Sequence, residues 1–231
     1  MQISHLFVRG LAFVAIALTL SACDQKATSQ QAETQQAVVA KNEIVALSGK
    51  TMGTTYHIKY WGNNEVSITS QQAHEQIESI LKAVNAKMST YIQDSEISRF
   101  NQNTETNTPI EVSADFALVV KEAMRLNQVT QGALDVTVGP VVNLWGFGPE
   151  KRVEKQPTQE QITERQAWVG IDKLSLTEES GKFFLVKSVP QLYVDLSSIA
   201  KGFGVDQVAD YLESIHVQNY MVEIGGEIRA K

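Results

Sequence analysis

The spacing of apolar residues changes from strand-like to helix-like along the chain, and this change constrains the fold most strongly. The run NEIVALSGKTMGTTYHIKYW predicts two strands around a Gly-Lys-Thr-Met-Gly turn, and its second half alternates polar and apolar residues as a half-buried strand does. His57 lies on the polar side, so we expect it in solvent. The spacing then becomes helical over 69–88, where Thr69 and Gln72 form a capping box and the apolar stripe consists of Ala73, Ile77, Ile80, Leu81, Val84 and Met88. His74 lies off this stripe and is expected at the surface.

Strands and helices remain mixed along the rest of the chain, without a regular βαβ alternation. After a polar, turn-like segment over 88–102, the patterns predict a helix over 114–131 between Ser113 and Gly132, a helix after Pro157 with Thr158 and Gln161 as its capping box, a hairpin turning at Ser180-Gly181, a strand over 191–198, a helix over 201–215 and a final strand with a Gly-Gly break. This mixture predicts the α+β class: one domain over 43–231 with a mixed, mainly antiparallel sheet and packed helices.

The acidic balance of the chain limits what it can bind. Its 231 residues include 20 Lys and Arg against 26 Asp and Glu, a formal net charge of −6. Nucleic-acid-binding domains usually carry a basic excess that meets the phosphates, so we expect no nucleic-acid partner. An acidic protein that binds a phosphorylated ligand needs a local positive group, such as a helix N-terminus or a metal ion.

Residues 1–22 have the composition of a bacterial secretion signal. Arg9 lies in a short N-terminal region, and LAFVAIALTL is an apolar stretch too short to span a bilayer. The motif Leu-Ser-Ala-Cys, ending at Cys23, resembles the lipobox, in which cleavage leaves a lipidated first cysteine. The alternative is an ordinary signal peptide followed by an incidental cysteine.

The residues after Cys23 indicate a tether and a location. Residues 23–42 are rich in Gln, Ala, Thr and Ser and lack apolar periodicity, which is typical of a flexible linker. Asp24 resembles the enterobacterial signal for retention at the inner membrane. We therefore expect a lipoprotein anchored on the periplasmic side of the inner membrane of a Gram-negative bacterium.

The stretch VDLSSIAKGFGVDQVADYL, residues 194–212, places an acid, two serines, a lysine and two glycines between a predicted strand and a predicted helix. Free amides and the positive end of the helix dipole meet at such a junction, so it can hold a phosphate. The alternative is a plain connection with a serine cap and closely packed glycines, since Gly-x-Gly alone is no dinucleotide or P-loop fingerprint.

Two further stretches carry candidate residues. In GALDVTVGPVVNLWGFG, Asp135 lies in an apolar, strand-like run, where a carboxylate needs donors or a cation, and glycines flank a short turn with Trp145. A capping or salt-bridged Asp135 and a core Trp145 are the alternative. Met52, in a tight turn, is either core filler or a soft wall against a ring system.

Together and in this order, KTMGTTY, MSTYIQDSEISRFN, GALDVTVGPVVNLWGFG, VDLSSIAKGFGVD and VEIGGEIR closely resemble the ApbE family of FAD:protein FMN transferases, over residues 45–231. The resemblance implies Mg²⁺-dependent transfer of the FMN half of FAD to a Thr or Ser hydroxyl of a target protein, with release of AMP. It also implies acceptors such as subunits of the Na⁺-translocating NADH:quinone reductase or of the Rnf complex.

The resemblance also implies a set of site residues. Matched position by position, the FAD contacts are Met52, Tyr91, Ala133, Leu134, Asp135, Asp195 and Lys201, and Ser198 supplies a main-chain carbonyl to magnesium. An ammonium close to FAD would offset phosphate charge.

The sequence departs from the family pattern at its end. Family members continue past the Gly-Gly strand to a His-x-x-Asp-Pro-x-x-Gly segment and to an Asp and a Thr that complete the magnesium site, whereas this sequence stops at Lys231. We therefore expect a C-terminally truncated flavin transferase whose catalytic residues belong to the missing part. The alternatives are a non-catalytic FAD-binding lipoprotein and a hydrolase that cleaves FAD to FMN and AMP.

Overall fold

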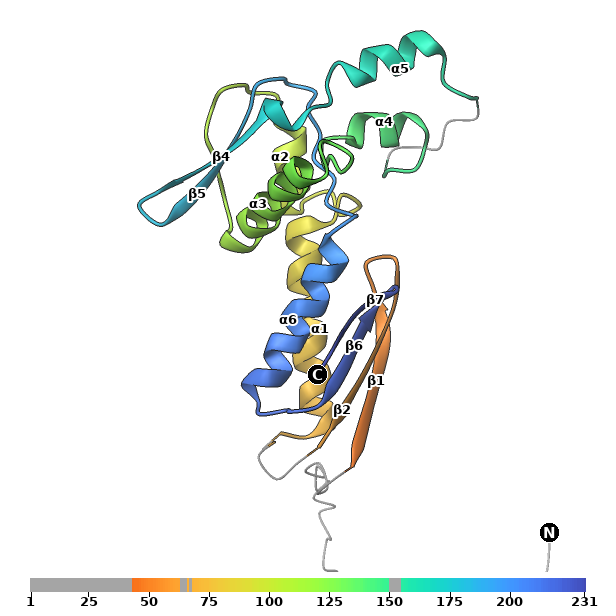
Figure 1. Ribbon diagram of the computed structural model, residues 1–231, viewed down its shortest axis with the longest axis vertical. Coiled ribbons are helices and arrows are strands. Elements are labelled where there is room, and N and C mark those ends of the chain that lie inside the picture. The colour runs from red at the N-terminus through yellow and green to blue at the C-terminus, as the bar shows by residue number, and fades with distance from the viewer. Residues whose placement is uncertain (1–42, 63–65, 67, 150–154) are drawn as a thin grey trace, which may run out of the picture. The chain divides into compact units, whose positions relative to one another are not determined.

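The computed structural model describes residues 43–62, 66, 68–149 and 155–231 (Figure 1). All of them belong to one compact unit, Gln36–Lys231. The expected signal segment, Cys23 and the expected tether lie outside the described residues. Strands and helices are mixed as predicted, and the α+β class is confirmed.

A four-stranded antiparallel sheet contains both ends of the described chain. Its order is β1-β2-β6-β7, with β1 at Ile44–Thr51, β2 at Thr54–Trp61, β6 at Tyr220–Ile224 and β7 at Glu227–Ala230. The predicted alternation in β2 is confirmed, because Tyr56, Ile58 and Tyr60 are buried whereas His57 is exposed. His57 is not free in solvent, however, since its Nδ1 lies 2.7 Å from Glu223 Oε2 on the neighbouring strand.

The turn between β1 and β2 is tighter than predicted. The strand continues through Thr51, so only Met52 and Gly53 form the turn, with φ angles of 49° and 73°. Two successive residues of positive φ match the right-handed twist of a hairpin, but a methionine adopts such a φ rarely.

Two long helices, α1 (Ser70–Met88) and α6 (Ala200–Ser214), run side by side against one face of this sheet (Figure 1). The predicted capping box at Thr69 and Gln72 is present. His74 is half-buried rather than fully at the surface, because the hydroxyl of the buried Tyr56 lies 2.8 Å from His74 Nε2 and donates to Glu78 Oε1 at 2.5 Å. One hydrophobic cluster fills the space between the helices and the sheet.

The second hydrophobic cluster lies around a three-stranded antiparallel sheet of order β3-β5-β4. The elements around it are α2 (Glu96–Gln102), β3 (Ile110–Val112), α3 (Ala114–Val129), α4 (Gly139–Leu144), α5 (Gln159–Gln166), the 3₁₀ turn η1 (Ile171–Lys173), β4 (Leu174–Glu179) and β5 (Lys182–Lys187). The predicted caps at Ser113 and Thr158 and the hairpin turning at Ser180-Gly181 are confirmed.

Three local predictions are wrong. The turn-like segment over 88–102 contains α2, because Ser95 caps the helix and Ile97 and Phe100 bury their side chains. The run around Asp135 forms turns and α4 instead of a strand. The strand expected over 191–198 joins no sheet: it makes a single bridge, between Tyr193 and Val138, among the described residues.

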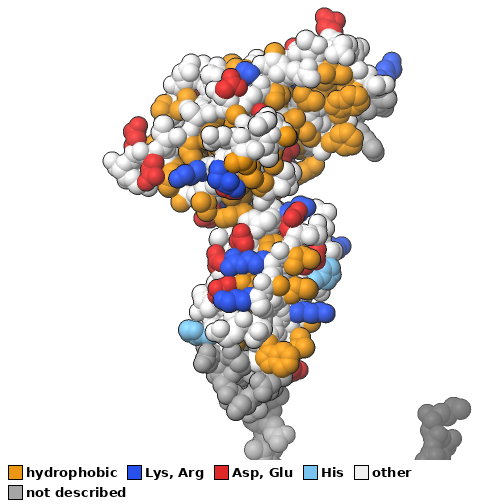
Figure 2. All heavy atoms as spheres, in the orientation of Figure 1, with side chains coloured by type: hydrophobic (Ala, Val, Ile, Leu, Met, Phe, Trp, Pro, Cys, Tyr) orange, Lys and Arg blue, Asp and Glu red, His pale blue; other side chains and the backbone are white. Residues whose placement is uncertain are grey.

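Charged side chains of both signs are intermixed on the face shown in Figure 2. On β7, Arg229 illustrates the pairing, since its guanidinium lies 2.9 to 3.1 Å from carboxylate oxygens of Asp206, Asp210 and Glu213 on α6. These ion pairs hold β7 against the helix. Among the described helices, none combines the length and the apolar character that crossing a bilayer requires.

Candidate functional site

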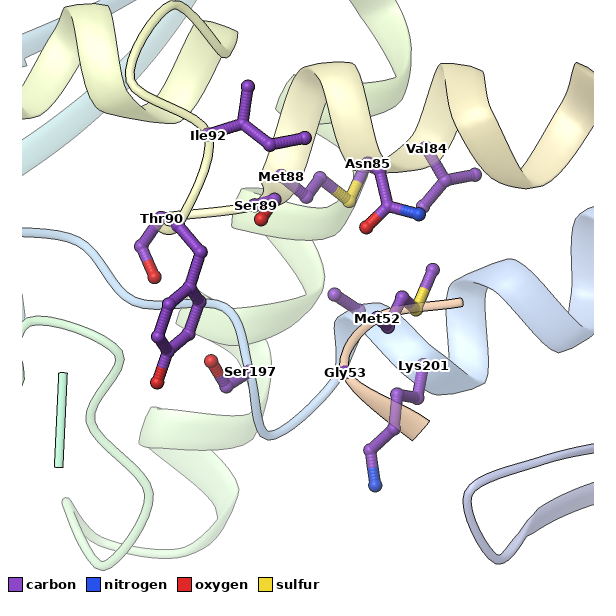
Figure 3. Close-up of a pocket in the computed structure, with 12 residues that line it drawn as sticks. Met52, Gly53, Val84, Asn85, Met88, Ser89, Thr90, Ile92, Ser197 and Lys201 are labelled. Carbon is purple, nitrogen blue, oxygen red and sulfur yellow. The ribbon is translucent and has the colours of Figure 1, made fainter. Parts of the chain in front are cut away.

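A pocket of about 600 Å³ opens where the Met52-Gly53 turn, the end of α1 and the start of α6 meet (Figure 3). This volume lies in the range of small-molecule sites. Its lining consists of Met52, Gly53, Val84, Asn85, Met88, Ser89, Thr90, Tyr91, Ile92, Ser197, Ala200 and Lys201. Of the predicted site residues, Met52, Tyr91 and Lys201 therefore share one pocket.

Met52 forms a wall of this pocket from a strained position in the hairpin turn. Its side chain packs against both hydrophobic clusters, and its methyl carbon reaches α6 at Gly204. A thioether placed in this way presents a soft apolar surface, which suits the face of a ring system.

Asn85 fixes the turn to α1 and was not predicted from the sequence. Its Nδ2 donates to Thr51 Oγ1 and to the Leu81 carbonyl, each at 2.9 Å. The side-chain oxygen is left facing the pocket, where it can accept a hydrogen bond from a ligand (Figure 3). An asparagine inside a helix, where it is a poor helix former, was the available signal.

Tyr91 stands at the mouth of the pocket with 68% of its surface exposed. Its hydroxyl donates to the Phe147 carbonyl at 3.1 Å and so joins the loop after α1 to the loop after α4. Tyr91 also borders a second cavity of about 450 Å³. An exposed ring between two cavities is free to stack on a ligand.

The start of α6 supplies the positive end of the pocket. Among the described residues no side chain caps this helix, and Lys201 lies in its first turn and lines the pocket. The Lys201 ammonium lies 3.4 Å from the Gly225 carbonyl and 3.3 Å from Glu227 Oε1. Uncapped amides together with an ammonium favour a phosphate at this end.

Asp195 acts on the pocket through its neighbour Ser197. Its Oδ1 accepts hydrogen bonds from Ser197 N at 2.8 Å and from Ser197 Oγ at 2.5 Å, and Ser197 lines the pocket. Its Oδ2 accepts no hydrogen bond from the residues that the structure describes. Ser198 is exposed in the same turn, and no backbone amide of the described ranges donates to its carbonyl oxygen.

Ala133, Leu134 and Asp135 do not line this pocket. The Asp135 carboxylate accepts hydrogen bonds from Thr137 N at 2.8 Å, Thr137 Oγ1 at 2.6 Å and Ile171 N at 3.2 Å, as a capping aspartate does. Ala133 is exposed and Leu134 half-buried beside it. Their contact with a nucleotide stays a prediction. Trp145 is 39% exposed and is therefore not a core residue.

The described residues do not form a complete metal site. They contain no group of three or more His, Cys, Asp or Glu side chains that could hold an ion. Beside the pocket they offer the Ser198 carbonyl and the Asp195 carboxylate, which are oxygen ligands of the kind that magnesium prefers but too few to define a site. The pocket itself combines an apolar wall at Met52 with a positive end at Lys201 and the start of α6.

Comparison with known proteins places the chain in a family. The ApbE family matches residues 52–231. A FAD:protein FMN transferase of Haemophilus influenzae is 65% identical over 224 residues, which is 97% of this chain and 60% of the relative. The Escherichia coli protein of the same name is 37% identical over 221 residues, 96% of this chain and 60% of the relative.

Solved structures agree. The flavin transferase ApbE from Vibrio cholerae superposes with a TM-score of 0.77 at 56% identity and covers 82% of this chain and 60% of that one. The flavinyl transferase ApbE of Pseudomonas stutzeri, in its apo form, gives 0.76 at 34% identity, with 84% and 63% covered. The chain belongs to the ApbE family and spans 55% to 60% of the length of the curated relatives that it matches.

Proposed function

We propose that the protein is an FAD:protein FMN transferase, which carries out protein flavinylation. One observation carries the proposal: in a member of the ApbE family, the Met52 wall and the positive start of α6 with Lys201 face the same pocket. An apolar wall and a phosphate-binding end are the two features that a flavin nucleotide needs.

The proposed reaction is a phosphoryl transfer within the diphosphate of FAD. The hydroxyl oxygen of a Thr or Ser in the target protein bonds to the phosphorus of the FMN half, and the bond from that phosphorus to the bridging oxygen breaks. The bridging oxygen leaves with AMP, and the hydroxyl proton passes to a base. Lys201 and the α6 amides would neutralise the diphosphate and hold it in line for attack.

Magnesium dependence is part of the proposal on the strength of the family resemblance. A bound magnesium ion would neutralise negative charge on the diphosphate and the leaving AMP. The described residues offer it only the Ser198 carbonyl and the nearby Asp195 carboxylate, and they contain no group of three or more His, Cys, Asp or Glu side chains that could hold an ion.

The location and the partners are proposals as well. The lipobox ending at Cys23 supports a lipid anchor on the periplasmic side of the inner membrane. Acceptors exposed there, such as subunits of the Na⁺-translocating NADH:quinone reductase or of the Rnf complex, would present the hydroxyl.

Mass spectrometry of an acceptor domain tests the transfer. This chain and a version extended to the length of the curated relatives are each incubated with FAD, Mg²⁺ and the acceptor; with the extended version we expect the acceptor to gain the mass of FMN less water, with equimolar AMP. An acceptor with Val in place of its target Thr is the matched control and should gain nothing. FMN and AMP formed while the acceptor gains no mass would indicate a hydrolase, and FAD binding without any product would indicate a binding protein; either outcome contradicts the transfer.

A further inference from the structure

Lys187, the last residue of β5, is buried in a way that is rare for lysine. Its exposed fraction is 0%, and lysine is almost never fully buried unless it is paired with an acid. The described hydrogen-bond partners of its ammonium are three backbone carbonyls, those of Phe100 and Asn101 at 3.3 Å and of Leu192 at 3.5 Å. The ammonium also lies 5.2 Å from the centre of the Phe100 ring.

These three carbonyls belong to two segments that are far apart in the sequence. Phe100 and Asn101 lie in the last turn of α2, where backbone carbonyls lack partners within the helix and the dipole is negative. Leu192 lies in the segment that leads to α6. A single ammonium therefore ties the end of α2 to that segment.

Asn101 makes a second tie two residues further along the same segment. Its Nδ2 donates to the Val194 carbonyl at 2.8 Å, and its Oδ1 accepts from the Val194 amide at 2.8 Å. The side-chain amide thus satisfies both backbone groups of Val194, as a neighbouring strand would. Asp195 is the next residue.

The segment needs such ties because no sheet holds it. Leu192, Val194 and Leu196 are each 0% exposed and alternate as in a strand. Among the described residues, the backbone contacts that join this stretch to another part of the fold are the Tyr193–Val138 bridge and the bond from Asp195 N to the Val136 carbonyl at 2.7 Å. Its other backbone bonds are local: Leu192 N donates to the Val189 carbonyl, and the Leu196 carbonyl accepts from the amides of Ile199 and Ala200. Buried backbone groups without a ladder require side-chain partners.

We propose that Lys187 and Asn101 are positioning residues that fix the segment 192–196, and through it Asp195, Ser197 and the start of α6. Neither residue lines the pocket of about 600 Å³; Asn101 lines the second cavity of about 450 Å³ beside Tyr91, whereas Lys187 lines neither, so Lys187 is the cleaner probe of positioning. Both residues hold in place the backbone that leads into the start of α6, which forms the positive end of the pocket. The consequence for FAD binding rests on the proposed function, whereas the positioning itself does not.

Hydrogen–deuterium exchange of the full chain tests the positioning. In Lys187→Met and in Asn101→Ala, we expect the amides of 192–203 to exchange roughly tenfold faster, because each variant removes two or three buried hydrogen bonds. The amides of β2 and of the first half of α1, in the other hydrophobic cluster, should keep their protection. Lys182→Met and Asn103→Ala are matched controls: Lys182 is an exposed lysine of the same strand, paired with Glu111, and Asn103 caps the same helix.

Chemical restoration of the ammonium at position 187 separates the effect of its hydrogen bonds from the effect of side-chain packing. Lys187→Cys is alkylated with bromoethylamine while unfolded and then refolded, which restores an ammonium on a side chain of lysine's length. Cys23 is the only other cysteine, so the wild-type chain treated in the same way is the control. We expect the treated variant to regain protection over 192–203. Unchanged protection in Lys187→Met and Asn101→Ala, or failure of the ammonium to restore it, would overturn the proposal.

FAD affinity, measured on the same samples, separates the positioning of segment 192–196 from its consequence for ligand binding. If the wild-type chain binds FAD, both positioning variants should bind it about tenfold more weakly, since the start of α6 is no longer held. If the wild-type chain does not bind FAD, the proposed function fails while the exchange result still decides the positioning.

Discussion

The methyl carbon of Met52 lies 2.9 Å from the position that a Cβ on Gly204 would take. The hairpin turn thus reaches α6 at a residue without a side chain, and this contact sets where the methionine stands at the pocket. Because the nearest atom is the end of a flexible side chain, a larger residue at 204 would move Met52 and leave the backbone in place.

Gly204→Ala should therefore change ligand binding more than stability. The helix gains roughly 1 kcal/mol from alanine, which the displaced methionine offsets, so the free energy of unfolding should change by less than about 1 kcal/mol. FAD affinity should fall roughly fivefold in a fluorescence titration. Equal affinities of Gly204→Ala and the wild type would contradict the role of Met52.

Asp195→Ala should weaken FAD binding about tenfold, because it removes both hydrogen bonds that shape Ser197 at the pocket. Calorimetric titration measures the loss. Asp172→Ala, on η1, is the matched control and should have little effect. Asp195→Asn retains an acceptor oxygen without the charge. Where its FAD affinity lies between those of the wild type and Asp195→Ala shows how much the charge contributes. If Asp172→Ala costs as much as Asp195→Ala, the special role of Asp195 is wrong.

The ring of Tyr91, rather than its hydroxyl, should matter for binding. Tyr91→Phe removes only the exposed bond to the Phe147 carbonyl, and its FAD dissociation constant should stay within about twofold of the wild-type value. Tyr91→Ala removes the stacking surface and should weaken binding by roughly 1 kcal/mol, about fivefold. Quenching of flavin fluorescence reports both. Equal binding by the Phe and Ala variants would exclude stacking on this ring.

Lys187 should give the stability of the chain a distinct pH dependence. Burial lowers the pKa of its ammonium from 10.5 to about 8. Between these values the unfolded chain holds the proton that the folded chain has released, so this group makes the free energy of unfolding rise with pH. Relative to Lys187→Met, the wild type should gain about 2 kcal/mol between about pH 8 and about pH 10 in urea titrations. Lys182→Met is the control, and a constant difference between wild type and Lys187→Met would refute the depressed pKa.

The sequence predicted those elements whose signals are local. The capping boxes at Thr69 and Thr158, the Ser113 cap and the hairpin at Ser180-Gly181 are satisfied within a few residues, so the pattern alone determined them. The segment at 191–198 has the alternation of a strand, yet its partners are the side chains of Asn101 and Lys187, which the pattern cannot reveal.

The site was predicted in part for the same reason. Met52 and Lys201 carry visible signals, a methionine in a turn and a lysine at a helix start, and the structure brings them to one pocket. Met88 looked like an ordinary residue of the apolar stripe, and Asn85 carried only the weak signal of an asparagine inside a helix, because only the packing of α1 against the turn brings both to the pocket. Asp135 carries a visible sequence signal but does not line this pocket, and its carboxylate already accepts hydrogen bonds from the amides of Thr137 and Ile171.

A crystal structure of the chain with FAD tests the central claim most directly. We expect flavin nucleotide density in the pocket of about 600 Å³, with ring atoms against Met52 and diphosphate oxygens within hydrogen-bonding distance of the Lys201 ammonium or the first amides of α6. Density for FAD elsewhere on the chain, or a pocket that stays empty at saturating FAD, would contradict the assignment of this pocket as the flavin site.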